Sequence, residues 1–219
     1  MGRVLPILFN SDMVCSLLEG RKTTTRRKID IGTVEQFAVD KDGKTVIAYV
    51  DPGTGDTCSP EEICRYKPGD ILYVRETWSF IPCIGCNGDY VRKGGPYNCY
   101  DCQAVEYDDG DSISDGCFVY RADCEAPERI TWHPSIHMPK QAARIWLEVR
   151  DVEVERLQDI STHGCYREGV DISRGGVFKR FAELWDSTIK KTEIDRYGWR
   201  ANPWVWVIRF DLCRRPEGW

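Results

Sequence analysis

Apolar residues recur every three to four positions in parts of the chain, and this spacing predicts helices there. Ser11 is placed to cap a first helix that runs to Leu18, and Gly20 follows at the position where helices commonly end. Ser161 is placed to cap a short helix that ends before Gly169. The spacing of apolar residues between positions 178 and 189 predicts a longer helix.

Alternating or β-rich apolar runs predict strands between these helices. The predicted strands cover residues 34–39, 46–50, 71–74, 118–120, 145–154 and 204–210, with a hairpin turn at 41–44 and a loop at 52–60. Strands and helices do not alternate regularly, which favours an α+β fold with a mixed, largely antiparallel sheet or small barrel and helices outside it. A length of 219 residues and the lack of an internal repeat favour a single domain over 1–219.

Composition and charge narrow the classes of protein to consider. With 42% hydrophobic and 30% charged residues, the chain is not disordered throughout. It contains no apolar run near the roughly 18 residues that span a bilayer and no signal peptide, so we expect a cytoplasmic protein without a membrane partner. The net charge of −5 argues against a uniformly basic surface that coats nucleic acid, so any such contact is local.

Residues 81–115 are rich in glycine, cysteine and aspartate and lack periodicity, which is typical of a metal-stapled insertion. Two C-x-x-C pairs lie in it, Cys83 with Cys86 and Cys99 with Cys102, twelve residues apart. Four thiolates fill the tetrahedral shell of Zn²⁺, so we predict one structural zinc ion. The alternatives are free thiols or a redox pair, and Cys117 and Cys124 are reserve ligands.

A basic segment follows the first predicted helix. Residues 20–27 read GRKTTTRR, and five cations occur in the eight positions 21–28. Cations and hydroxyls together can hold an anion or the polar edge of a nucleobase. The alternative is a solvated group of cations favoured by the dipole of the preceding helix.

This segment resembles the signature G-x-K-x-x-[ET]-x-R of the ASCH domain, a β-barrel family related to the PUA RNA-binding fold, with Gly20, Lys22, Thr25 and Arg27 in the motif positions. The likeness extends through residues 67–78, 137–140, 144, 157–161 and 202–206, which cover most of the chain outside the hairpin and the insertion. The combination is similar to larger ASCH-type proteins of bacteriophages and prophages. The resemblance implies a PUA-like mixed β-barrel with flanking helices, here carrying the zinc insertion at about 81–115.

The resemblance also implies a function. The first expectation is a protein that binds RNA or a modified base in a cleft lined by the GRKTTTRR segment. A second is an amidohydrolase that deacylates N4-acetylcytidine-like nucleosides, because the family's catalytic lysine, threonine and glutamate match Lys22, Thr25 and Glu168. In that role Thr25 is the nucleophile, Lys22 the base, and Glu168 the group that orients them. A third reading is a phage accessory protein that binds a host protein through its zinc loop.

Further residues are candidates for contacts with nucleic acid or substrate, and each also has a structural explanation. The candidates are Arg21, Arg26, Arg27, Arg75, Glu76, Trp78, Lys140, Arg144 and Trp204. Arg75 and Glu76 follow a buried strand, so they either line the pocket or form a structural ion pair. Trp78 and Trp204 either stack on a base or belong to the core. Glu168 is either the catalytic carboxylate or an exposed residue at a helix end.

Overall fold

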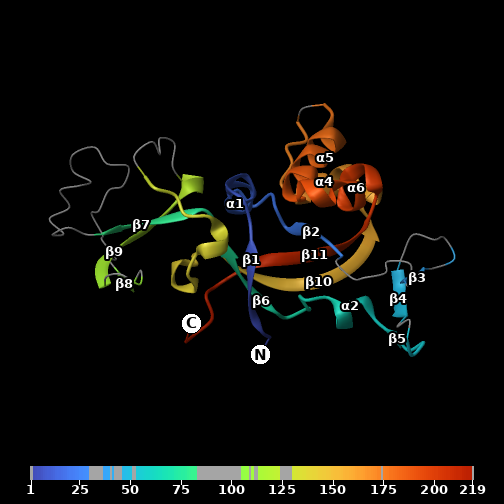
Figure 1. Ribbon diagram of the computed structural model, residues 1–219, viewed down its shortest axis with the longest axis horizontal. Helices are drawn as coiled ribbons and strands as arrows, with labels where there is room; N and C mark the ends of the chain where they lie inside the picture. Colours follow the sequence, from blue (N-terminus) through green and yellow to red (C-terminus); the bar gives the residue numbers. More distant parts are fainter. Residues whose placement is uncertain are drawn as a thin grey trace. The chain divides into compact units, whose positions relative to one another are not determined.

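The computed structural model describes residues 2–29, 37–39, 41, 46–50, 53–82, 105–108, 110, 113–123, 130–173 and 175–218 (Figure 1). The chain divides into two compact units. The first consists of Met1–Pro6, Ser16–Tyr73 and Ile145–Trp219, and the second of Ile7–Cys15 and Val74–Arg144. The prediction of one domain over the whole chain stays a prediction.

A five-stranded sheet has the strand order β1-β6-β10-β11-β2. Its strands are β1 (Val4–Leu8), β6 (Ile71–Arg75), β10 (Trp146–Arg156), β11 (Trp204–Cys213) and β2 (Thr24–Lys28). The long pair β10 and β11 is antiparallel, and β2 and β6 join its two sides, also antiparallel. Within the described residues the sheet is open, with β1 and β2 at its edges. The predicted α+β class is confirmed, and no closed barrel is present in this part of the chain.

Helices cover one face of the long strand pair in the first unit (orange in Figure 1). They are α4 (Thr162–Arg167), α5 (Val177–Thr188) and α6 (Ile194–Tyr197), with short 3-10 turns η6 (Leu157–Asp159), η7 (Lys191–Glu193) and η8 (Trp199–Ala201). Phe181 and Trp185 of α5 pack with Val205 and Val207 of β11 and with Leu157 in one buried cluster. Burying this apolar surface is the main force that holds the helices on the sheet.

The remaining elements of the first unit are small. A three-stranded sheet has the order β3-β4-β5, formed by β3 (Phe37–Val39), β4 (Val46–Val50) and β5 (Thr57–Cys58), and α2 (Pro60–Ile63) follows it. β5 and the start of α2 fall in the segment 52–60 that was predicted to be a loop. The prediction was wrong there because a two-residue strand and a one-turn helix leave no periodicity to read.

The second unit contains a sheet of order β7-β9-β8, with β7 (Trp78–Pro82), β8 (Val105–Asp108) and β9 (Ile113–Tyr120). Three 3-10 turns accompany it, η3 (Arg121–Asp123), η4 (Ser135–His137) and η5 (Lys140–Ala142). The described ends of the predicted insertion at 81–115 are therefore strands. Cys83, Cys86, Cys99, Cys102 and Cys124 lie outside the described residues, so the zinc site stays a prediction.

The helices α1 and α4 each begin with a side-chain cap. Ser161 caps α4, since its hydroxyl accepts a hydrogen bond from the Gly164 amide at 3.0 Å, as predicted. Helix α1 (Ser11–Leu18) begins where expected, but its cap is Asn10, whose Oδ1 accepts from the Met13 amide at 2.9 Å. Asparagine and serine are about equally good caps. The prediction of Ser11 as the cap was therefore wrong by one residue, because the preceding asparagine is an equally good cap.

No helix in the described part of the chain is long and apolar enough to cross a membrane.

Candidate functional site

Strand β2 carries the basic segment along one edge of the sheet and divides its side chains between two faces. Arg26 lies opposite Val207 of β11, and Thr25 lies opposite Ile208. Because neighbouring residues of a strand point to opposite faces, Arg26 shares the helix-covered face with Val207, whereas Thr25 faces the other way. The motif residues are thus not presented to one common surface by the strand itself.

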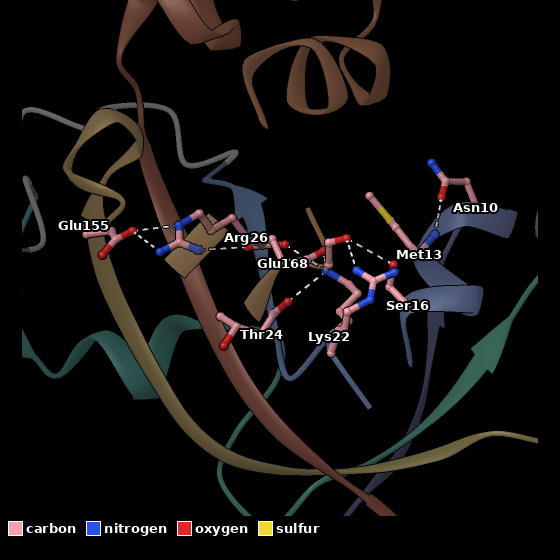
Figure 2. A network of polar contacts seen from close by, with 10 residues as sticks. Asn10, Met13, Ser16, Lys22, Thr24, Arg26, Glu155 and Glu168 are labelled. Carbon is pink, nitrogen blue, oxygen red and sulfur yellow. Dashed lines mark hydrogen bonds and ion pairs between the residues drawn. The ribbon is translucent and has the colours of Figure 1, made fainter. Parts of the chain in front are cut away.

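Lys22 precedes β2 and is fully buried, with 2% of its surface exposed. Its Nζ donates to the Thr24 carbonyl oxygen at 2.8 Å, to the Glu168 carbonyl oxygen at 3.0 Å and to Glu168 Oε2 at 2.8 Å (Figure 2). These three oxygens match the three N–H bonds of an ammonium group. The structure therefore brings together Lys22 and Glu168, which the resemblance paired although they are 146 residues apart.

Glu168 follows α4 and links two cations. Its Oε2 accepts from Lys22, and its Oε1 accepts from Arg26 at 3.0 Å. Arg26 continues the network, since its Nε donates to Glu155 Oε1 at 2.7 Å. Lys22, Glu168, Arg26 and Glu155 thus form a chain of alternating charge, with two positive and two negative groups. A buried network of this kind is tolerated because each charge has a partner of opposite sign.

The pKa values in this network follow from burial and pairing. Burial lowers the pKa of Lys22, and Glu168 opposes this effect. Burial also disfavours the ionised form of Glu168, but Lys22 and Arg26 outweigh it and hold the pKa of this carboxyl below its ordinary value. For Arg26, burial is likewise outweighed by Glu168 and Glu155, so its pKa is raised. We infer an ionised Glu168, because it accepts from two cations at once.

The turn after α4 is fixed to the segment that precedes β2. The Thr23 amide donates to the Arg167 carbonyl oxygen at 2.9 Å, and Arg21 donates to the Gly169 carbonyl oxygen at 2.5 Å. Gly169 has a φ of 97°, and a Cβ there would lie 2.7 Å from the Cβ of Ser16. Only glycine meets both conditions without strain. This turn therefore sets the position of Glu168 relative to Lys22.

A cavity of about 380 Å³ lies beside the distal half of β2. Its lining consists of Arg26, Arg27, Lys28, Trp185, Thr188, Ile189, Lys190 and Glu193. Lys28 donates to both carboxylate oxygens of Glu193, at 3.0 Å each, and its Nζ lies 4.6 Å from the centre of the Tyr197 ring. The cavity therefore combines part of the basic segment with an apolar wall from the end of α5.

The predicted contacts of the second unit form a separate network. Glu76 has 1% of its side chain exposed and forms two hydrogen bonds with Arg144, at 2.9 and 3.0 Å. Arg144 also pairs with Asp123 and lies over the Tyr120 ring, 4.0 Å from its centre. Burial raises the pKa of Glu76 although Arg144 pulls it down. For Glu76 the structure favours the structural ion pair over a residue that lines a pocket.

Arg75 and Lys140 are the two remaining binding candidates in this part of the sequence. Arg75 Nε donates to the Met138 carbonyl oxygen at 2.8 Å, which ties β6 to the turn before η5. Lys140 begins η5 and is half-buried. Their predicted role in binding stays a prediction.

The two tryptophans proposed as stacking surfaces are buried. Trp78 is 4% exposed and packs against His133, with ring centres 5.0 Å apart. Trp204 is 6% exposed and is covered by Arg156, whose guanidinium lies 4.2 Å from the ring centre. A base cannot stack on either ring in this arrangement, so both belong to the core. The pattern of the sequence does not separate a buried tryptophan from an exposed one within a β-rich run.

The structure thus groups the predicted residues unevenly. Lys22, Arg26 and Glu168 are in direct contact. Thr25 is 1% exposed, so a substrate reaches its hydroxyl only after neighbouring side chains move. The sequence prediction did not include Glu155, nor the α5 and η7 residues that line the cavity. Glu155 lies one residue beyond the strand predicted at 145–154, and an acidic residue at a strand end gives no signal of its partner.

The described residues contain no cluster of three or more histidine, cysteine or acidic side chains that could hold a metal ion. No protein-family model, curated protein or solved structure matches the chain.

Proposed function

We propose that this protein binds a nucleoside, free or as a modified base of RNA, in the cavity beside the GRKTTTRR segment. The observation that carries the proposal is the cavity itself, about 380 Å³ in volume and lined by Arg26, Arg27 and Lys28 of that segment. Its volume lies within the range of about 300–1,000 Å³ that is typical of small-molecule sites. The resemblance to the ASCH family, with its PUA-like fold, supports the same class of ligand.

The chemistry of the lining fits a flat polar ligand. Ile189 supplies apolar contact together with the small accessible part of Trp185, which is 5% exposed. Arg26 and Lys28 supply hydrogen-bond donors for the carbonyl and ring nitrogen acceptors of a base. Arg26 is held in place by its ion pairs with Glu155 and Glu168, at 2.6 and 3.0 Å. The buried network then acts as a support that fixes the direction of the arginine.

The test is a binding titration with a variant that fills the cavity. Thr188 and Ser187 are both exposed near the end of α5, and both hydroxyls donate to the carbonyl three residues earlier. Only Thr188 is among the lining residues. Thr188→Trp should lower the affinity for nucleosides by about tenfold or more, whereas the matched control Ser187→Trp should not change it.

Isothermal titration calorimetry with the four ribonucleosides, N4-acetylcytidine and short RNAs carrying the same modification would measure these affinities. The lack of binding by all of them at low ionic strength would overturn the proposal. Equal loss of affinity in both tryptophan variants would move the site elsewhere.

As a second candidate we propose an amidohydrolase of N4-acylated nucleosides, favoured by the 2.8 Å contact between Lys22 and Glu168. In this reaction the Thr25 hydroxyl adds to the amide carbon, and Lys22 takes its proton. The nucleoside amine leaves with that proton, and water then hydrolyses the acetyl ester and regenerates the threonine. In the ion pair with Glu168, Lys22 is an ammonium, so this role requires it first to lose a proton; burial, which lowers its pKa, acts in that direction, whereas Glu168 opposes it.

The measurement is release of cytidine from N4-acetylcytidine, compared between the protein, Lys22→Arg and Thr25→Ser. Lys22→Arg keeps a cation beside Glu168 but removes the base, so activity should fall by at least about 100-fold, in the range typical of a lost general base. Thr25→Ser keeps a nucleophile and should retain activity. Equal rates in all three proteins would eliminate this candidate.

Zinc binding by the cysteine pairs is a further proposal that rests on their spacing alone. One zinc ion per chain is expected by elemental analysis of the purified protein, and Cys83→Ser with Cys99→Ser should remove it. Cys58→Ser is the control, because Cys58 lies in β5 outside the pairs. A metal content unchanged by the double substitution would contradict the proposal.

A further inference from the structure

The charges around the cavity differ in how far they are already neutralised. Arg26 has two carboxylate partners, Glu155 and Glu168. Lys28 has Glu193, which itself lines the cavity. These cations offer hydrogen bonds but little net positive potential, because each is matched by a carboxylate within 3.0 Å.

The side chain of Arg27 does not add its positive charge to the cavity. Arg27 alternates with Arg26 and Lys28 along β2, so its side chain points to the opposite face of the sheet. Burial lowers the pKa of Arg27, and Tyr66 and Glu168 oppose this effect.

Lys190 is different from the other lining cations. It is exposed, it precedes η7 at the rim of the cavity, and it has no ion pair with any residue that the structure describes. Lys190 is therefore the position where the lining can accept an added negative charge. Glu193, three residues further along, is already paired with Lys28, so this pair offers no further net charge to a second anionic group.

We propose, as a refinement that rests on the proposed nucleoside site, that its preferred ligand is a nucleoside monophosphate, with the single phosphate held at Lys190. The uncharged base and sugar then occupy the charge-balanced interior against Trp185 and Ile189. A nucleoside triphosphate or a continuous RNA strand brings further phosphates, and the described lining has no further unmatched cations to receive them. The ligand is thus selected by the number of its charges as well as by its base.

The prediction is a difference in affinity between matched ligands. A nucleoside 5′-monophosphate should bind about tenfold more tightly than its nucleoside, as one charge-assisted hydrogen bond provides, and about as tightly as or more tightly than the triphosphate. Lys190→Met should abolish the preference for the monophosphate. Lys191→Met is the matched control, because Lys191 is the next residue, is equally exposed and does not line the cavity.

The experiment titrates the full chain and both variants with cytidine, its monophosphate, its triphosphate, a cytidine trinucleotide and inorganic phosphate, and repeats the set with the other bases. Equal affinity for nucleoside and monophosphate overturns this inference and leaves the nucleoside site standing. A preference that survives Lys190→Met overturns the assignment to Lys190. The lack of binding by every nucleoside and nucleotide overturns the proposed function and this inference with it.

Discussion

Two buried carboxylates, one in each unit, respond to burial in opposite directions. Glu168 lies between Lys22 and Arg26, and its pKa is lowered. Glu76 is equally buried and accepts two hydrogen bonds from Arg144, yet its pKa is raised. Both side chains have 4% or less of their surface exposed, so burial alone does not decide the direction.

The difference lies in how many cations each carboxylate has and whether it shares them. Glu168 pairs with two cations, Lys22 and Arg26. The other carboxylate of the network, Glu155, pairs with Arg26. Glu76 has one cation, and Arg144 is shared with Asp123, whose negative charge itself raises the pKa of Glu76. Two cations, of which Lys22 is not shared with Glu155, compensate Glu168 for lost solvation, whereas one arginine shared with Asp123 does not do so for Glu76.

Removal of Lys22 should give the largest effect. Lys22→Met leaves a buried Glu168 with one cation fewer and two carbonyl oxygens without their donor, so the free energy of unfolding should fall by about 4 kcal/mol. Urea denaturation followed by circular dichroism measures this. Lys191→Met is the exposed control and should stay within about 0.5 kcal/mol of the wild type. A loss of no more than about 0.5 kcal/mol, the range expected for the control, would mean that Glu168 does not depend on Lys22.

Arg144→Met should cost less, about 3 kcal/mol at neutral pH, at the lower end for a broken buried pair. The reason is that Glu76, whose pKa is already raised, can take up a proton when its cation is lost. The cost should therefore shrink as the pH is lowered toward 5. Denaturation at several pH values tests this, with Arg150→Met, an exposed residue, as the control. A cost that does not change with pH would contradict a protonated Glu76.

The dependence of stability on pH should differ in sign between the two carboxylates. A lowered pKa means that the unfolded chain binds more protons, so the contribution of Glu168 is present above its ordinary value of 4.5 and is lost as the pH falls below it. A raised pKa has the reverse effect, so the contribution of Glu76 is present below 4.5 and is lost as the pH rises through its folded value. Glu168→Gln should flatten the acid limb of the stability profile. Glu76→Gln should make the free energy of unfolding rise more steeply with pH just above 4.5. If both variants changed the slope of stability against pH in the same direction, the comparison would be refuted.

The smallest effect is expected for the half-buried pair of Lys28 and Glu193, whose side chains are 27% and 30% exposed. Solvent screens this pair, so Lys28→Met should cost about 0.5 kcal/mol, and the cost should decline in 0.5 M salt. The same denaturation experiment measures it. A loss as large as that of Lys22→Met would show that the cavity side of β2 is as dry as the buried network.

The long helices and strands with a clear pattern of apolar residues were predictable from the sequence. The helix predicted at 178–189 is α5 (Val177–Thr188), and the strand predicted at 204–210 is the start of β11 (Trp204–Cys213). Helix α5 buries a stripe of apolar side chains with helical spacing, and β11 begins with a β-rich apolar run that is buried on both faces; both are signals that a sequence records. Strand β8 (Val105–Asp108) was missed: its four residues alternate between apolar and polar, but so short a run does not stand out in a segment rich in glycine, cysteine and aspartate.

The site was less predictable, because its contacts depend on which strands become neighbours. Lys22 and Glu168 were paired only through the family resemblance. Strand β10 carries acidic residues at 151, 153 and 155, and these alternate with valines like any solvent-facing row. Asp151 and Glu153 pair with Arg209 instead, so nothing local to Glu155 indicates that it is the one that meets Arg26.

The bond between Lys22 and Glu168 also has a consequence for synthesis of the protein. The two residues are separated by 146 positions. The two partners of Arg26, Glu155 and Glu168, also lie far downstream of it in the sequence. At a translation rate of about 5–20 residues per second, Lys22 is added to the chain roughly 7–30 s before Glu168. During that interval the lysine has to remain hydrated, so this corner of the first unit closes only after the turn at Gly169 has been translated.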